Sequence, residues 1–258
     1  MDDNLRVLAF FAHPDDETML AGGILALLAR QGAQVYYLCA TRGEGGENGE
    51  PPLCALVELG AVREQEMRCA VEALGAAGLA FLDHIDPRVG ADNTLYAYCD
   101  DVDALAGQVR EAVLRWNIGA VITHGSNGEY GHPAHLVTHQ AARLAVEGLG
   151  ERAPLLYSSN ACFPGHPKPR LANKDDDAHM VVDISTVLAQ KTAAALCHAT
   201  QHALFVRNAS KEAGRPMRVE EVIVSLESLH RHLPLVADGR VDDPLAALLR
   251  ASGQVREA

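Results

Sequence analysis

The amino-acid sequence predicts an α/β fold in which a mostly parallel sheet carries helices on both faces. Short apolar or β-branched runs alternate with segments of helical periodicity, as expected for repeated strand–helix–strand units. The chain of 258 residues has the length of one large domain. Its composition, with 48% hydrophobic and 22% charged residues, is that of a globular protein. We therefore expect a single domain over residues 1–258.

The N-terminal part of the chain carries the clearest alternation. Residues 6–12 predict a strand, residues 18–31 a helix and residues 34–40 a second strand. Three further helix–strand pairs are expected at 61–74 and 79–82, at 102–116 and 120–123, and at 134–147 and 155–158. Five strands in βα order therefore form a core over about residues 5–160.

The pattern becomes less regular toward the C-terminus. Residues 164–177, with three prolines and the acidic run Asp175-Asp176-Asp177, predict a loop. The elements expected after it are a strand at 179–184, a helix at 186–202 and an apolar run at 219–226. We expect residues of about 178–230 to complete the fold, and a polar tail after about residue 250.

Charge and hydropathy exclude several classes of partner. The formal net charge of −12 disfavours nucleic acid and anionic membranes, because binding to these draws on clustered Lys and Arg. The longest apolar stretch, residues 19–29, is too short to span a bilayer. Residues 1–4 lead into the first strand without the basic segment of a secretion signal. We expect no membrane span.

The six cysteines are scattered and include no C-x-x-C pair. This pattern suggests neither a structural zinc ribbon nor a disulfide framework. It fits a reducing compartment, and we therefore expect a cytoplasmic location. The cysteines are Cys39, Cys54, Cys69, Cys99, Cys162 and Cys197.

The turn after the first strand concentrates charge. In His13-Pro14-Asp15-Asp16-Glu17, one imidazole and three carboxylates stand between a buried strand and a helix. A divalent metal is the usual means of holding such carboxylates ionised together. Carboxylates also cap helix N-termini. The segment by itself favours the two readings equally.

A second cluster follows the fourth strand. His132 and His135 are three residues apart at a loop-to-helix junction, and Pro133 suits the first helical turn. An isolated H-x-x-H pair is more often structural. However, ligands bind beyond the carboxyl ends of parallel strands, where both clusters and the segment 41–50 are expected. A catalytic zinc commonly takes three N or O ligands, and these clusters offer one carboxylate and two histidines.

These residues resemble the PIG-L/LmbE deacetylases, which carry an A-H-P-D-D-E segment early and a G-H-P-D-H segment later. The chain has the first segment at 12–17 and a variant of the second at 131–135. The resemblance also includes Thr-Arg-Gly-Glu at 41–44 and Arg-Glu-x-Glu at 63–66. It covers roughly the first 160 residues and is weaker beyond them, where Lys191 and the segment 198–201 are similar.

The resemblance implies a Rossmann-like fold and a metal site. Zinc would be bound by His13, Asp16 and His135, with iron as an alternative that the same ligands accept. Asp15 would act as general base on the attacking water. The oxyanion formed from the acetamide would be stabilised by His132 or Tyr130. The products would be acetate and a free amine.

The chain departs from the family at Ala134, where an Asp usually stands between Pro and the last His. That Asp would orient His132, and Asp86 is a candidate to replace it. Arg63 resembles the family's substrate-contacting arginine, although it could also be a solvated surface charge. We expect Arg63, Glu44 and Asp86 to bind a small-molecule sugar conjugate. His139, His198 and His202 are read as packing or supporting residues.

Three alternatives stay open. A dinucleotide-binding protein would share the sheet pattern, but His-Pro-Asp-Asp follows the first strand in place of G-x-G-x-x-G. A non-catalytic metal-binding module would keep the fold without turnover. An amidase acting on a thiol conjugate would stay within the family. The group joined to the sugar and a homo-oligomeric state are not specified by any motif.

Overall fold

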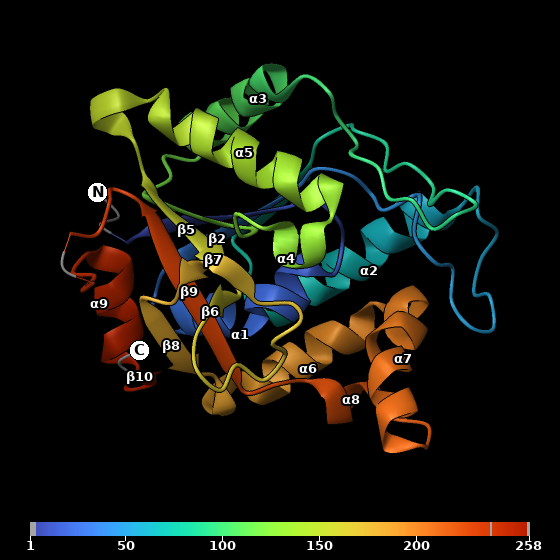
Figure 1. Cartoon of the computed structure of the whole chain (residues 1–258). Coiled ribbons are helices and arrows are strands. Elements are labelled where there is room, and N and C mark those ends of the chain that lie inside the picture. Colours follow the sequence, from blue (N-terminus) through green and yellow to red (C-terminus); the bar gives the residue numbers. More distant parts are fainter. Residues whose placement is uncertain (1–3, 238, 257–258) are drawn as a thin grey trace.

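An eight-stranded sheet forms the centre of the molecule (Figure 1). The computed structural model describes residues 4–237 and 239–256. The strand order is β10-β8-β9-β5-β4-β1-β2-β3, with β1 to β5 parallel and β8, β9 and β10 antiparallel. The strands are β1 (Arg6–Phe11), β2 (Gln34–Cys39), β3 (Gly78–Phe81), β4 (Ala120–Thr123), β5 (Leu155–Ser159), β8 (Met180–Asp183), β9 (Leu226–Leu233) and β10 (Val255–Arg256).

The strand order reverses at β1, which pairs with β2 on one side and with β4 on the other. Phe11 pairs with Cys39 of β2, and Phe10 pairs with Thr123 of β4. The three strands therefore end at the same edge, and the loops that follow them meet there. This is the switch point at which open α/β sheets bind ligands.

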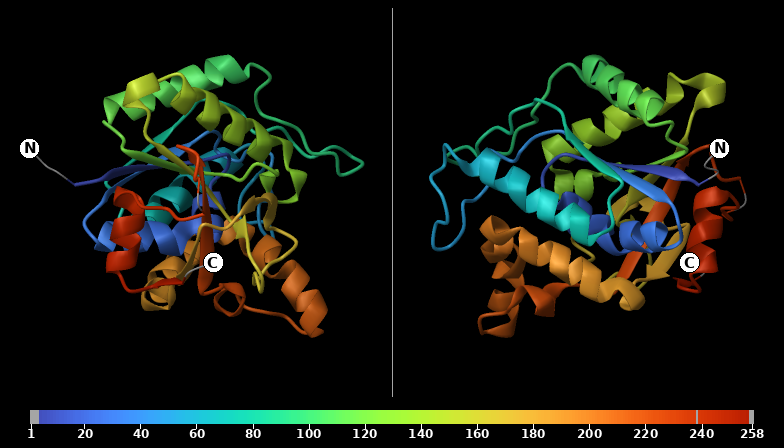
Figure 2. Two further views of the ribbon diagram at one scale, coloured as in Figure 1. Left: turned by 60° about the vertical axis from the view of Figure 1, so that its left-hand side comes forward. Right: turned by 180° about the vertical axis from the view of Figure 1, so that it is seen from behind.

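Helices cover both faces of the sheet, as Figures 1 and 2 show. α1 (Asp16–Arg30), α2 (Leu59–Ala73) and α6 (Leu188–Cys197) pack on one face, and α3 (Val102–Arg115) and α5 (Pro133–Glu147) on the other. An apolar cluster lies between the helices and the sheet on each face. Successive side chains of a strand point to opposite faces, so each buried strand contributes to both clusters. The remaining helices are α4 (Gly128–Gly131), α7 (His202–Ala213), α8 (Val219–Val222) and α9 (Pro244–Ala251).

The α/β class and the five βα units are confirmed, but three C-terminal expectations are wrong. The predicted loop 164–177 contains a strand, β7 (Asn173–Asp177), which pairs with β6 (Ala161–Cys162). The predicted helix 186–202 ends at Cys197. After residue 250, where a polar tail is expected, β10 pairs with β8. The ends of the predicted 1–258 domain, residues 1–3 and 257–258, lie outside the described residues.

A disulfide joins Cys69 of α2 to Cys197 of α6. The cysteine pattern, which suggests no disulfide framework, did not indicate this bond, because the two cysteines are 128 residues apart and meet only through helix packing. Within the described residues, no helix has the length and apolar character needed to cross a membrane.

Replacing both cysteines with Ala is expected to lower the free energy of unfolding of the oxidised protein by about 2–4 kcal/mol, because the crosslink restricts the unfolded chain. Urea unfolding in oxidising buffer measures the difference. In the presence of a reductant, the wild type should approach the stability of the variant. Equal unfolding curves in oxidising buffer would show that the bond does not form in solution.

Candidate metal centre

In the turn between β1 and α1, the carboxylates of Asp15 and Asp16 make contacts outside the helix. Asp15, the residue before α1, has a φ of 112°, and its side chain accepts no capping hydrogen bond from the described helix. Asp15 Oδ2 instead accepts from Arg63 Nη2 at 3.0 Å. Asp16 Oδ2 accepts from the backbone N–H of His13 at 2.9 Å. Neither Asp15 nor Asp16 therefore caps α1 through a side-chain hydrogen bond, although Asp16 lies in its first turn.

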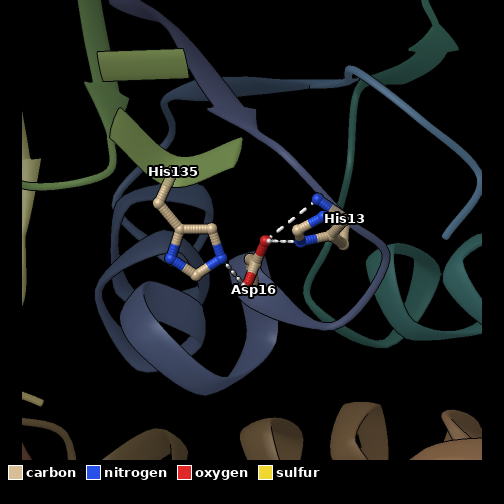
Figure 3. A group of neighbouring side chains, drawn as sticks. All are labelled: His13, Asp16 and His135. Carbon is tan, nitrogen blue, oxygen red and sulfur yellow. Dashed lines mark hydrogen bonds and ion pairs between the residues drawn. The ribbon is translucent and has the colours of Figure 1, made fainter. Parts of the chain in front are cut away.

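His13, Asp16 and His135 converge at the switch point (Figure 3). Asp16 Oδ2 lies 3.2 Å from His13 Nδ1, and Asp16 Oδ1 lies 3.4 Å from His135 Nε2. All three residues are buried. Two imidazoles and one carboxylate with facing ligand atoms match the donor set that holds a divalent metal. The structure thus contains a candidate metal-binding cluster built from the turn after β1, the first residue of α1 and the start of α5.

Each imidazole of this cluster has its second nitrogen on another carboxylate. His13 Nε2 lies 3.3 Å from Asp86 Oδ1, and His135 Nδ1 lies 2.6 Å from Glu129 Oε2. Such contacts fix the tautomer and the ring orientation of a metal-binding histidine. Burial lowers the pKa of His135, so the ring is held in the neutral, ligating form.

Asp86 therefore supports a different histidine from the one expected. It contacts His13, whereas the sequence suggested that it replaces the missing carboxylate beside His132. Glu44 in turn supports Asp86, because Glu44 Oε2 accepts from the backbone N–H of Asp86 at 3.1 Å. The reason lies in the loop 82–101, whose path places Asp86 against the turn after β1.

Glu129 is the important residue that the sequence analysis missed. Its Oε2 accepts from the Nδ1 atoms of both His124 and His135, at 3.1 and 2.6 Å. Its Oε1 accepts from the N–H of Gly125 and the amide of Asn173, both at 3.2 Å. Burial acts to raise the pKa of Glu129, but His124 and His135 hold it well below the usual range. The only sequence signal was an acidic residue a few positions before His132 and His135.

His124, also missed, is fully buried beside the cluster. Its Nε2 accepts the backbone N–H of Ala12 at 3.1 Å, so the ring proton resides on Nδ1 and is donated to Glu129. The rings of His124 and His135 stack with centroids 3.9 Å apart. One glutamate thus orients two stacked imidazoles, and His139 Nδ1 donates to the backbone carbonyl of His124.

Arg63 holds Asp15 in place. It is 3% exposed, which excludes the interpretation as a solvated surface charge. Besides Asp15, its guanidinium donates to the carbonyls of Pro14 and Gly43. Gly43 has a φ of 68°, and a Cβ there would lie 2.1 Å from Arg63 Nη1, so only glycine fits. Burial raises the pKa of Asp15 to about 7, with Arg63 opposing the shift and Asp16 adding to it.

His132 and Tyr130 lie beside the cluster, at the entrance to α5. His132 Nδ1 accepts the N–H of Ala134 at 3.2 Å, which leaves the proton on Nε2. Burial lowers the pKa of His132 to about 3, so the ring is neutral. Tyr130 is 57% exposed, and its ring lies at steep angles to the rings of His132 and His135, in T-shaped pairs. The Ala134 side chain is fully buried in the apolar layer between α5 and the sheet.

Comparison with known proteins places this centre in a family. A deacetylase from Segniliparus rotundus that acts on 1D-myo-inositol 2-acetamido-2-deoxy-α-D-glucopyranoside is 31% identical, over 85% of this chain and 86% of its own. Two solved structures share the fold. The 4-carboxy-2-hydroxymuconate hydratase GalB of Pseudomonas putida KT2440 has a TM-score of 0.61 and 24% identity, covering 91% of this chain and 98% of its own. The N,N'-diacetylchitobiose deacetylase of Pyrococcus horikoshii has a TM-score of 0.54 and 17% identity, covering 89% and 84%.

Residues 8–146 match the family described as PIG-L, GlcNAc-PI de-N-acetylase. The match spans both motif segments, from the first strand to the helix that carries His135. The likeness to a hydratase concerns the fold alone, whereas the family match and the similarity to the S. rotundus enzyme extend along the sequence itself. The chain belongs to the PIG-L family.

Proposed function

We propose that this chain is a zinc-dependent deacetylase that removes the acetyl group from an N-acetylglucosamine-type conjugate. The observation that carries the proposal is the buried cluster of His13, Asp16 and His135 with Asp15 held beside it. The similar deacetylase of S. rotundus suggests an N-acetylglucosaminyl unit linked to inositol as the substrate class. The products are acetate and a primary amine.

The ligand atoms fit zinc, with His13 Nδ1, one Asp16 oxygen and His135 Nε2 facing one another. Zinc held by these three residues would supply a Lewis acid for the acetamide carbonyl and would lower the pKa of a water molecule beside it. Asp15, whose pKa is raised to about 7, accepts the proton of the attacking water and returns it to the leaving amine. Arg63 keeps the Asp15 carboxylate in position for both transfers.

Oxyanion stabilisation is assigned to the entrance of α5. His132 is neutral with its proton on Nε2, so it donates a hydrogen bond without carrying charge. The hydroxyl of Tyr130 is the second candidate donor. For the substrate we keep the three predicted contacts, Arg63, Glu44 and Asp86. Of these, Arg63 and Asp86 also support Asp15 and His13.

The alternative functions predict different experimental results. A binding module would hold zinc and release no acetate, and an amidase of a thiol conjugate would cleave a larger amide in place of the acetamide. A dinucleotide-binding protein would bind nicotinamide cofactors, although Asp15 and Asp16 oppose a pyrophosphate at this position. Iron in place of zinc changes none of the ligand assignments.

The decisive experiment measures acetate and primary amine from zinc-loaded protein with a panel of N-acetylglucosaminyl conjugates, including the inositol conjugate. We expect equal amounts of both products, loss of release after chelation and recovery with Zn²⁺ or Fe²⁺. The corresponding glucosaminyl conjugates, which lack the acetyl group, serve as controls. Zinc-loaded protein that releases no acetate from any conjugate would contradict the proposal.

We also propose that the protein is located in the cytoplasm. Four cysteines are free, in keeping with a reducing compartment, but the disulfide between Cys69 and Cys197 opposes it, because such bonds are rare in the cytosol. Alkylation of thiols in intact cells, followed by mass spectrometry of the peptides around Cys69 and Cys197, distinguishes the two cases.

A further inference from the structure

A second group of metal-type ligands lies outside the cluster at the switch point. Asp176 of β7 and His230 and His232 of β9 offer ligand atoms that all lie within 4.8 Å of one another. The two histidines are two residues apart on a strand, so both side chains leave the same face. A hydrogen bond from His230 Nδ1 to the carbonyl of Asp177 joins β9 to β7, whose labels stand side by side in Figure 1.

Asp176 is oriented as a ligating carboxylate would be. It is 2% exposed, and it accepts hydrogen bonds from the N–H and Oγ of Ser126 at 2.8 and 2.5 Å and from Ser158 Oγ at 2.9 Å. A carboxylate has about four acceptor positions, and Oδ2 uses two of them here and Oδ1 one, so one position on Oδ1 is left for a cation. Hydrogen bonds of this kind hold metal-binding carboxylates in place.

The histidines are arranged in the same manner. Because His230 Nδ1 donates to a carbonyl at 2.7 Å, its Nε2 carries the free lone pair. His232 Nε2 lies 3.5 Å from Asp176 Oδ2. Two ligands of a tetrahedral zinc ion lie roughly 3.3 Å apart, given bonds of about 2.0–2.2 Å. The observed separation is therefore that of neighbouring ligands.

The surroundings leave this group available to a cation. Arg231, between the two histidines, directs its guanidinium to Asp243. His179 Nδ1 accepts the N–H of Arg231 and is thereby occupied, and His139 donates to the carbonyl of His124. The ring of His139 packs edge-on against His232 with centroids 4.8 Å apart, which restrains that ring.

We propose that Asp176, His230 and His232 form a second binding site for a divalent transition metal ion, with zinc as the probe. Two imidazoles and one carboxylate suit zinc and its neighbours in the first transition series. Binding through His232 Nε2 replaces its hydrogen bond to Ser158 Oγ, and the imidazole proton then resides on Nδ1. The site is separate from the proposed deacetylation.

Zinc stoichiometry tests the site without reference to activity. After equilibration with Zn²⁺ and removal of loosely bound metal, we expect two zinc ions per wild-type chain, one for each group. The double variant His230→Gln/His232→Gln should retain one, and His13→Gln/His135→Gln should also retain one. His202→Gln, which alters a histidine outside both groups, is the matched control and should retain two.

A wild type that binds one zinc ion, or a His230→Gln/His232→Gln variant that still binds two, overturns the proposal. The first result would mean that the group is held by hydrogen bonds alone. The single variant His230→Gln tests whether loss of zinc results from misfolding. It removes one half-buried ligand and leaves the hydrogen bonds of Asp176 intact, so we expect a folded protein that retains one zinc ion. Co²⁺ supplies a second readout: its absorption bands in the His13→Gln/His135→Gln background should disappear when His230 is also replaced. Failure of deacetylation in every variant would count against the proposed function and leave the zinc count unaffected.

Discussion

Asp15→Asn is expected to lower kcat for acetate release by about 10²–10⁴-fold, the usual contribution of a general acid–base group. Asparagine keeps the size of the side chain but cannot accept the proton of the attacking water. Zinc content should remain that of the wild type, because the ligand atoms belong to His13, Asp16 and His135. Steady-state kinetics with the best substrate of the panel, together with metal analysis, measure both quantities.

Asp83→Asn is the matched control, because the Asp83 side chain is 93% exposed and lies in the loop after β3. It should leave kcat unchanged. If Asp15→Asn retained wild-type kcat with full zinc content, Asp15 would be only a partner of Arg63, and another base would have to be sought.

Glu129→Gln is expected to weaken zinc binding by about 10–100-fold, the typical effect of losing a carboxylate that orients a metal-binding histidine. In the wild type, a single oxygen of Glu129 accepts from both His124 and His135, and the negative charge strengthens both bonds. Glutamine removes that charge. Competition with a chromogenic chelator measures the affinity, and saturating zinc should restore much of the acetate release.

Glu151→Gln, at an exposed position of a short helical turn after α5, provides the corresponding control. Unchanged zinc affinity in Glu129→Gln would show that packing alone orients His135. A loss of folding, seen as a lowered Tm of the zinc-free variant, would separate a general structural role from one specific to the metal.

The α/β core could be predicted because its signals are local. Apolar strands such as β1 and β4 and the periodic helices α1, α3 and α5 carry their own pattern, and the ends of parallel strands necessarily meet. β7 could not be predicted, because Asn-Lys-Asp-Asp-Asp has low strand propensity. Its stability depends on contacts such as those of Asp176 with Ser126 and Ser158.

In the candidate site too, residues in local motifs could be predicted and residues placed by loop packing could not. His13, Asp16 and His135 follow from motifs placed at strand ends, and the structure brings their ligand atoms together. Their roles remain predictions until metal is measured. Asp86 and Glu129 contact the second ring nitrogens of His13 and His135. Their positions depend on the paths of the loops at the edge of the sheet, and no short sequence pattern encodes these paths. Glu129 even takes a φ of 58°, a conformation that residue type alone does not indicate.

The contacts of Arg63 have a consequence for how the active-site loops keep their relative position. One planar group donates in several directions at once, to the carbonyls of Pro14 and Gly43 and to the carboxylate of Asp15. Arg63 therefore links the loop after β1 to the loop after β2 through hydrogen bonds and fixes their relative position. Lysine would keep the charge, but its single ammonium lacks the fixed fork needed to span both loops. The geometry around the reacting bond is thus maintained by a helix, α2, that lies outside the turns carrying the metal ligands.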